Sequence, residues 1–270
     1  MYKHLIYILL FGQLFSKNIW APQSAYLMPD KRWEVGLFHP FRYGLSDKIN
    51  YSIHPALFFI MPNLSIKLSH YKSEKKSTAT RHSVYYPTKL LKMLKAGVAV
   101  GDKTASLIPP GFIIPHMIGF SSDYVFTKIY SFGEASFYGG INLGVVIGDL
   151  DERTTIDLPL VYHRLGIFYN QYGIDLGVDF SKALTRSIGG YADLDLKLLP
   201  GFVGSYSIEH KFLFSWEKSK KTRVSFGYKF VYGKFPYGNQ ARILPFIPLL
   251  ESWVPMVDIQ WAGSVKNIKE

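Results

Sequence analysis

The chain has 270 residues, with 31 Lys and Arg against 20 Asp and Glu and a formal net charge of +11. Cysteine is absent, which excludes disulfide-stapled domains, thiolate zinc sites, iron–sulfur clusters and cysteine nucleophiles. Hydrophobic residues make up 48% of the sequence, which excludes a disordered chain. Long helical and strand patterns do not alternate along the chain, so an α/β enzyme is not expected.

The N-terminal segment has the pattern of a signal peptide. Lys3 and His4 precede an apolar stretch over residues 5–15. A helix of that length extends about 16 Å, roughly half of a bilayer core, so it is too short to span the membrane. We expect residues 1–25 to be a signal peptide and residues 26–270 to be one domain, the alternative being a buried N-terminal element. Small residues after which cleavage is expected are Ser16, Ala21 and Ala25.

The rest of the chain alternates large apolar residues with small, polar or charged ones. Successive side chains of a strand point to opposite faces, so this period of two predicts strands with one apolar and one polar face. In chain order the pattern covers 33–39, 47–56, 64–69, 94–101, 123–130, 134–147, 160–171, 173–180, 191–198, 205–216, 223–232 and 254–262. We therefore expect about twelve strands, within a range of about ten to fourteen, several of them long enough to cross a bilayer at a tilt.

Turn residues divide these strands into short and long connections. Short joints are expected at 45–48, 131–133, 171–173 and 199–201. Longer connections are expected at 72–93, 102–122, 149–159 and 234–253. Such alternation is typical of outer-membrane barrels. The fold class we predict is all-β, a single antiparallel transmembrane β-barrel.

The composition of the two faces indicates which of them points outward. Aromatic residues near strand ends are typical of the girdles of membrane barrels. They are Trp33, Tyr71, Tyr130, Tyr169, Tyr172, Trp216, Tyr232, Trp253 and Trp261. The polar faces carry charges of both signs, as a narrow lumen filled with paired charges requires. A soluble secreted barrel with its apolar face inward is the alternative.

One segment carries a family resemblance. The sequence RYGLSDKIN, at residues 42–50, resembles the Y-G-L-[ST]-D-[KR] hairpin of uncharacterised Gram-negative outer-membrane barrels, including porin-like and transporter-like ones. The resemblance implies a barrel exported to the outer membrane and inserted by the barrel-assembly machinery. The chain departs from the usual pattern at its end, where residues 267–270 read NIKE instead of finishing on an aromatic residue.

Two groups of charged residues are candidate sites. A lumen charge network is expected from Asp193, Asp195, Lys197, Glu209, Lys211, Arg223 and Lys229. A centre on Glu209 with Arg223 or Lys229 is expected, because crowded charges in a narrow lumen must pair. Contacts to anionic lipid and to lipopolysaccharide phosphates are expected from Lys72, Lys75, Lys76, Arg81, Lys89 and Lys92.

No motif indicates a catalytic, metal or cofactor site, and the sequence lacks G-x-S-x-G, H-E-x-x-H and phosphate-loop patterns. The nearest candidate hydrolase site is His116 with residues 121–123 (SSD), which also reads as a turn before a strand. The acidic residues within 149–157 read as a solvated loop. We expect a narrow pore, transport channel or structural barrel that contacts outer-membrane lipid and lipopolysaccharide and no nucleic acid. An outer-membrane enzyme acting on lipid or peptide, or a soluble secreted binding barrel, is the alternative.

Overall fold

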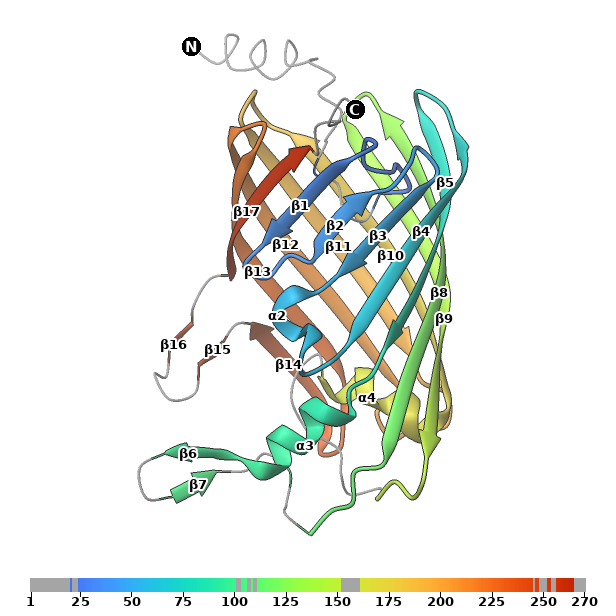
Figure 1. Ribbon diagram of the computed structural model, residues 1–270, viewed down its shortest axis with the longest axis vertical. Helices are drawn as coiled ribbons and strands as arrows, with labels where there is room; N and C mark the ends of the chain where they lie inside the picture. The colour runs from blue at the N-terminus through green and yellow to red at the C-terminus, as the bar shows by residue number, and fades with distance from the viewer. Residues whose placement is uncertain are drawn as a thin grey trace, which may run out of the picture.

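The computed structural model describes residues 20, 24–100, 103–105, 108, 111–151, 161–244, 246–247, 252–253 and 256–264. Twelve antiparallel strands close into a single barrel, which confirms the predicted all-β fold class (Figure 1). They are β1 (Arg32–Gly36), β2 (Phe41–Gly44), β3 (Ile49–Ile53), β4 (Asn63–Lys72), β5 (Lys76–Tyr85), β8 (His116–Tyr130), β9 (Gly133–Ile147), β10 (Tyr172–Ala183), β11 (Ile188–Leu198), β12 (Tyr206–Ser219), β13 (Thr222–Phe235) and β17 (Met256–Ser264). The other elements are α2 (Pro55–Phe58), α3 (Thr88–Ala96), β6 (Val98–Val100), β7 (Lys103–Ala105), α4 (Val161–Asn170), β14 (Gly238–Leu244), β15 (Phe246–Ile247) and β16 (Ser252–Trp253).

Strand β13 pairs with two different strands along one edge, one for each half of its length. Residues Thr222–Gly227 of β13 pair with β17, whereas Lys229–Phe235 of the same strand pair with β14. β15 and β16 pair with each other as a separate two-stranded sheet. β17 also pairs with β1, and this second pairing closes the barrel.

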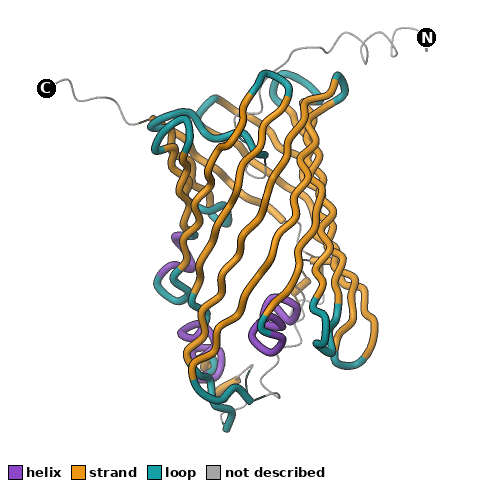
Figure 2. The backbone as a smooth tube through the Cα atoms, turned by 90° about the vertical axis from the view of Figure 1, so that its right-hand side faces the viewer, coloured by secondary structure: helices purple, strands orange, loops and turns teal. Residues whose placement is uncertain are grey.

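The two ends of the barrel have different connections. Short turns at 45–48, 73–75, 131–132, 184–187 and 220–221 lie at the upper rim in Figure 1, where β1 begins. Most connections at the lower end, where α3 and α4 lie, are longer, and among the described strands of the barrel wall only β13 and β14 are joined there by a two-residue turn (Figures 1 and 2). Such unequal ends are typical of up-and-down barrels. We refer to them as the short-turn end and the helical end.

One predicted strand is a helix, and another is partly helical. The segment expected as a strand over 160–171 contains α4, and the one expected over 94–101 contains the end of α3 and β6. In α4 residues on all sides are buried, so its apolar content shows no clear helical stripe. A short apolar run has no period that separates a strand from a buried helix. The joint predicted at 171–173 is therefore the junction of α4 and β10 and not a hairpin.

The long connections predicted at 72–93, 102–122 and 234–253 are also partly wrong. The first contains a tight turn at 73–75, the whole of β5 and the start of α3. β8 already begins at His116, so residues 121–123 lie within a strand instead of forming a turn before it. The third contains β14. In β5 the residues at the outward positions include Thr78, Thr80 and His82, so no row of large apolar residues marks this segment as a strand.

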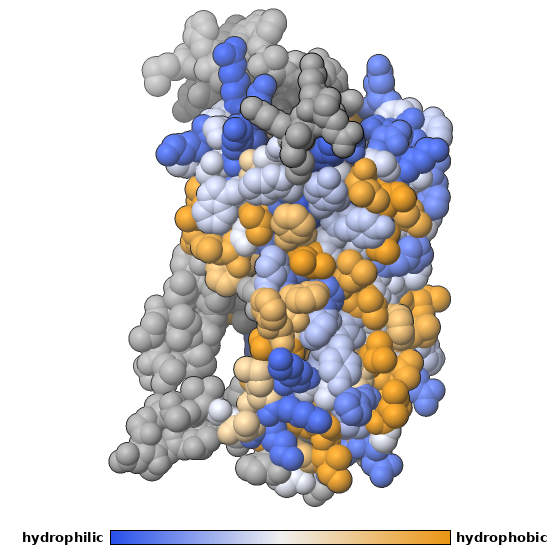
Figure 3. All heavy atoms as spheres, viewed as in Figure 1, coloured by the Kyte–Doolittle hydropathy of each residue, from blue (hydrophilic) through white to orange (hydrophobic). Residues whose placement is uncertain are grey.

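Large apolar side chains cover the outer wall of the barrel. On β9 alone, Phe137, Ile141, Leu143, Val145 and Ile147 are exposed at every second position. Apolar patches extend along the wall in Figure 3, and hydrophilic residues gather at the upper rim. The opposite faces of the strands hold buried charges such as Glu34 and Glu209. Among the described helices none is both long and apolar enough to span a bilayer.

Candidate functional site in the barrel lumen

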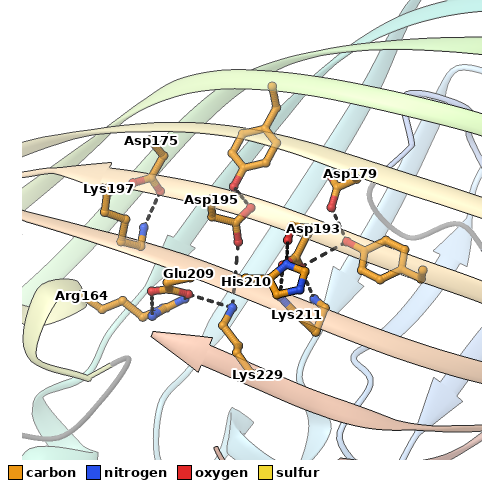
Figure 4. Close-up of polar contacts among 12 residues, drawn as sticks. Arg164, Asp175, Asp179, Asp193, Asp195, Lys197, Glu209, His210, Lys211 and Lys229 are labelled. Carbon is orange, nitrogen blue, oxygen red and sulfur yellow. Dashed lines mark hydrogen bonds and ion pairs between the residues drawn. The ribbon is translucent and has the colours of Figure 1, made fainter. Parts of the chain in front are cut away.

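A carboxylate on β12 joins two cations inside the barrel. Glu209 accepts hydrogen bonds from Arg164, Nη1 to Oε1 at 2.8 Å and Nη2 to Oε2 at 2.9 Å. Lys229 Nζ, on the neighbouring strand β13, lies 2.8 Å from Glu209 Oε2. The Glu209 side chain is 0% exposed, so both cations compensate a charge that has no access to water. Figure 4 shows the three side chains converging from α4, β12 and β13.

Further ion pairs continue this cluster along the same wall. Lys211 Nζ lies 2.7 Å from Asp193 Oδ2, and Lys197 Nζ lies 2.5 Å from Asp175 Oδ2 (Figure 4). Asp195 is 3.9 Å from Lys229 through its Oδ2. The structure thus brings together six of the seven residues expected in the lumen network.

Two tyrosines lie among these carboxylates. Tyr138 Oη donates to Asp195 Oδ1 at 2.8 Å, and Tyr191 Oη donates to Asp179. Asp179 faces Asp193 across the β10–β11 pair. The hydroxyl groups therefore place donors between acidic side chains that would otherwise repel each other.

Arg223, the seventh expected residue, belongs to a different cluster. Its Nε donates to Gln260 Oε1 at 3.0 Å, and its guanidinium lies over the ring of Trp20, 4.8 Å from the centroid. Arg32 stacks near the same ring at 5.1 Å. Of the two alternatives expected beside Glu209, the structure therefore has Lys229 in contact with Glu209 and Arg223 elsewhere.

The chain before β1 enters the lumen near the short-turn end. Trp20, Ser24 and Ala25 are buried, the last completely. Lys67 Nζ donates to the Ser24 carbonyl at 2.8 Å, and the Ala25 amide donates to Thr127 Oγ1 at 2.7 Å. These contacts come from wall strands β4 and β8, so the segment fills the inside of the barrel. Residues 1–19, which hold most of the expected signal peptide, lie outside the described residues.

Helix α4 occupies the lumen at the helical end. Leu165, Ile167 and Phe168 pack in one apolar cluster with Leu91 of α3 and Met117 of β8. This cluster holds the helix against the β8–β9 side of the wall, while the salt bridge with Glu209 ties it to β12. The described part of the lumen is thus filled at one end by α4 and at the other by the segment around Ala25.

His163 of α4 sits in a largely apolar environment. Its ring lies 4.8 Å from that of Phe235 in an edge-to-face arrangement, and its Nε2 is 3.0 Å from the Lys234 carbonyl. The ring is almost fully buried, and its Nδ1 has no hydrogen-bond partner among the described residues. Burial holds the pKa of His163 below its ordinary value of 6.5, because the protonated ring is poorly solvated there.

The residues expected to contact anionic lipid are split between the two ends of the barrel. Lys72, Lys75 and Lys76 are exposed at the short-turn end, around the β4–β5 turn. Lys89 and Lys92 are exposed on α3 at the helical end. Arg81 contradicts the expectation of an external loop, because it lies on β5 and pairs with Asp123 in the lumen at 2.8 Å.

The candidate hydrolase residues do not assemble into one site. His116 Nδ1 lies 2.5 Å from Tyr86 Oη, and Ser122 Oγ lies 3.1 Å from His82 Nδ1, on exposed side chains. Asp123, one position along the strand, is buried against Arg81 on the opposite face. In the described part of the chain no group of His, Asp and Glu has the arrangement of a metal site. Residues 152–157 of the acidic loop are outside the described residues.

The predicted lumen set omitted residues that the structure places there. Arg164 was expected on a strand, so its contact with Glu209 depends on the helix that sequence periodicity did not reveal. Glu34 with Arg42, and Arg81 with Asp123, are further lumen pairs. Glu34 and Asp123 lie in segments predicted as strands, whereas Arg42 and Arg81 lie outside them, and the pairs could not be assigned without the register.

Comparison with known proteins adds little to this description. No family model and no curated protein sequence matches the chain. A solved structure from a study called "Unveiling the Mechanism Behind the in-meso Crystallization of Membrane Proteins" is similar over 86% of this chain and 83% of its own, with 10% identity and a TM-score of 0.30. The protein is a closed twelve-stranded antiparallel β-barrel with a charge-lined lumen.

Proposed function

We propose that this protein is an integral outer-membrane β-barrel that acts as a narrow channel for small polar solutes, occluded at both ends in this conformation. The inverted polarity of the wall carries the proposal: Glu34 and Glu209 are 0% exposed, whereas Ile147 is 60% exposed. A water-soluble barrel has the reverse arrangement, because water solvates charges and apolar surface is driven inward. Lipid around the wall accounts for both observations.

The unequal ends support an orientation for the barrel. Short turns of membrane barrels face the periplasm and long connections face outward. The short-turn end, with the segment around Ala25, is then periplasmic, and the helical end is external. In this orientation Lys89 and Lys92 of α3 meet lipopolysaccharide phosphates, whereas Lys72, Lys75 and Lys76 face the periplasmic side and are better placed for phospholipid headgroups.

The buried N-terminal contacts favour one of the three expected cleavage positions. Cleavage after Ala21 or Ala25 would remove Trp20 and with it the ring that Arg32 and Arg223 stack upon. Cleavage after Ser16 leaves this contact intact. We therefore place the end of the signal peptide at Ser16, with insertion by the barrel-assembly machinery afterwards. N-terminal sequencing of the mature protein checks this directly, with Lys17 as the expected first residue.

Location and channel activity are tested separately. The protein is expected in the outer-membrane fraction, with heat-modifiable mobility on gels. In planar bilayers we expect small and infrequent openings of the native protein, because both ends of the lumen are filled. Recovery in the soluble periplasm would refute the membrane assignment. Stable insertion without any openings, even after the lumen segments are loosened, would leave a structural barrel and refute the channel.

A further inference from the structure

A cavity of about 330 Å³ lies in the lumen and is lined by residues of strands β2, β3, β4, β5, β8, β9 and β10. Most of its lining residues carry polar side chains, among them Ser52, Ser65, Lys67, Arg81, Ser83 and Asp123. Small-molecule sites in proteins occupy about 300–1,000 Å³, so this volume suits a ligand of one small ring and its substituents.

One row of this lining is built from hydroxyl and amide side chains. Ser52 faces Ser65 across β3 and β4, Ser65 faces Ser83, Ser83 faces Ser121, and Ser121 faces Asn142 on β9. The row therefore crosses five neighbouring strands at one level. Ser65 Oγ and Ser83 Oγ lie 2.7 Å apart, so the hydroxyl groups already orient one another.

The adjacent row is built from charges. Asn50, Lys67, Arg81 and Asp123 face each other in turn across β3, β4, β5 and β8. Gly140 continues the row between Asp123 and Asp175. A Cβ at Gly140 would lie 2.2 Å from Asp123 Oδ1, so a residue with a side chain would clash with this carboxylate and glycine avoids the clash.

The charges of the lining have partners inside the protein. Arg42 pairs with Glu34, Arg81 with Asp123, and Asp175 with Lys197. Lys67 donates to the Ser24 carbonyl. An ionic ligand would compete with these internal pairs, and separating a buried pair of opposite charges is costly. A neutral ligand with several hydroxyl groups can hydrogen-bond to both rows and leave the pairs intact.

We propose that the cavity binds a small, neutral, polyhydroxylated solute of about monosaccharide size, held by the serine row and by charge-assisted hydrogen bonds from the adjacent row. This inference rests on the proposed channel function and names the class of solute that the channel takes. Hydroxyl groups donate and accept, so the serine row matches the alternating donors and acceptors of a polyol. The charged row supplies the stronger bonds that fix its orientation.

Equilibrium dialysis of the full-length refolded protein in detergent tests the proposal, because it allows for slow entry into a filled lumen. The probes are D-glucose and myo-inositol, with D-gluconate and D-glucosamine as charged ligands of similar size. We expect at least one neutral probe to bind at least tenfold more tightly than either charged probe. Failure of both neutral probes to bind to the folded protein, or tighter binding of a charged probe, would overturn the proposal.

The variant Ser83→Ala/Ser121→Ala removes two hydroxyl groups of the serine row and should weaken binding of the neutral probe at least tenfold. The matched control is Ser207→Ala/Ser225→Ala, which changes two buried serines that do not line the cavity. Heat-modifiable mobility verifies the fold of each variant. Equal binding by the variant and the control would also overturn the proposal. Because localisation and bilayer openings are measured independently, loss of binding with intact membrane insertion refutes the solute class alone.

Discussion

Arg164 of α4 forms a bidentate salt bridge with Glu209 of β12, with N–O distances of 2.8 and 2.9 Å. The two residues are on elements that the sequence gives no reason to connect. Lys229 completes the arrangement from β13 at 2.8 Å. The bridge ties the helix that fills one end of the lumen to the wall of the barrel, so its loss should affect both stability and the passage through the lumen.

The substitution Glu209→Gln removes the carboxylate that Arg164 and Lys229 share, and Lys229 keeps only the 3.9 Å contact with Asp195. Breaking a buried pair by removing one partner costs about 3–5 kcal/mol, and we expect about 3 kcal/mol because Arg164 is partly exposed and can turn toward water. The lumen also becomes more positive, so openings should shift toward anion selectivity and become more frequent. Unfolding in lipid vesicles and reversal potentials in planar bilayers measure these two effects.

Glu74→Gln is the control for this substitution, since Glu74 is exposed in the turn between β4 and β5. It changes the net charge equally and should leave both stability and selectivity unchanged. If the two variants behave alike, the pairing of Glu209 contributes nothing to either property.

Phe212, at the middle of β12, lies on the apolar face opposite Lys211. Its ring packs 4.8 Å from Phe214 and 6.3 Å from Tyr228, all on the outer wall. In the membrane location that we propose, replacing Phe212 with Arg should destabilise the folded barrel by about 2–4 kcal/mol, because it moves a charge into the hydrocarbon core of the bilayer. Refolding into vesicles at increasing urea concentration measures the change. Phe212→Leu retains the apolar character and should cost less; equal losses would mean that this face does not contact lipid.

Trp20→Ala removes the ring between Arg32 and Arg223. The segment before β1 should then leave the lumen more readily, because both cation–π contacts are lost, each worth about 0.5–2 kcal/mol. We expect longer and larger openings in planar bilayers. Trp216→Ala is the comparison, since Trp216 is exposed on the outer wall. Unchanged openings in the Trp20 variant would show that this segment does not obstruct the channel.

Acidification should loosen α4 through His163. The pKa of this histidine in the folded protein lies below its ordinary value of 6.5, so the unfolded chain binds more protons between the two values. The contribution of His163 to stability is therefore complete above about pH 6.5 and decreases as the pH falls toward the lowered pKa. The free energy of unfolding at pH 7.5 and pH 5.0 measures it. In His163→Gln the pH dependence should be smaller than in the wild type, and an identical dependence would exclude His163 as its source.

Much of the barrel wall was predictable from local pattern. Strands 134–147, 205–216 and 223–232 were expected nearly at their observed positions, and the turns at 45–48 and 131–133 join the strands as predicted. The reason is that each strand has one face on the outer wall and one in the lumen, so apolar and polar side chains alternate along its sequence. The same alternation places Phe212 on the outer face of β12 and its neighbour Lys211 on the lumen face.

The sequence by itself determined the fold class, the faces of the long strands and most of the charges that line the lumen, because these depend on a period of two within single segments. Only the tertiary structure decided which charges meet, that α4 is a helix inside the lumen, and that Ser52, Ser65, Ser83, Ser121 and Asn142 form one row. Register and strand order arise from pairing between distant segments, and shifting a pair by one residue reverses every face. That information is shared among the strands, and no single stretch of sequence contains it.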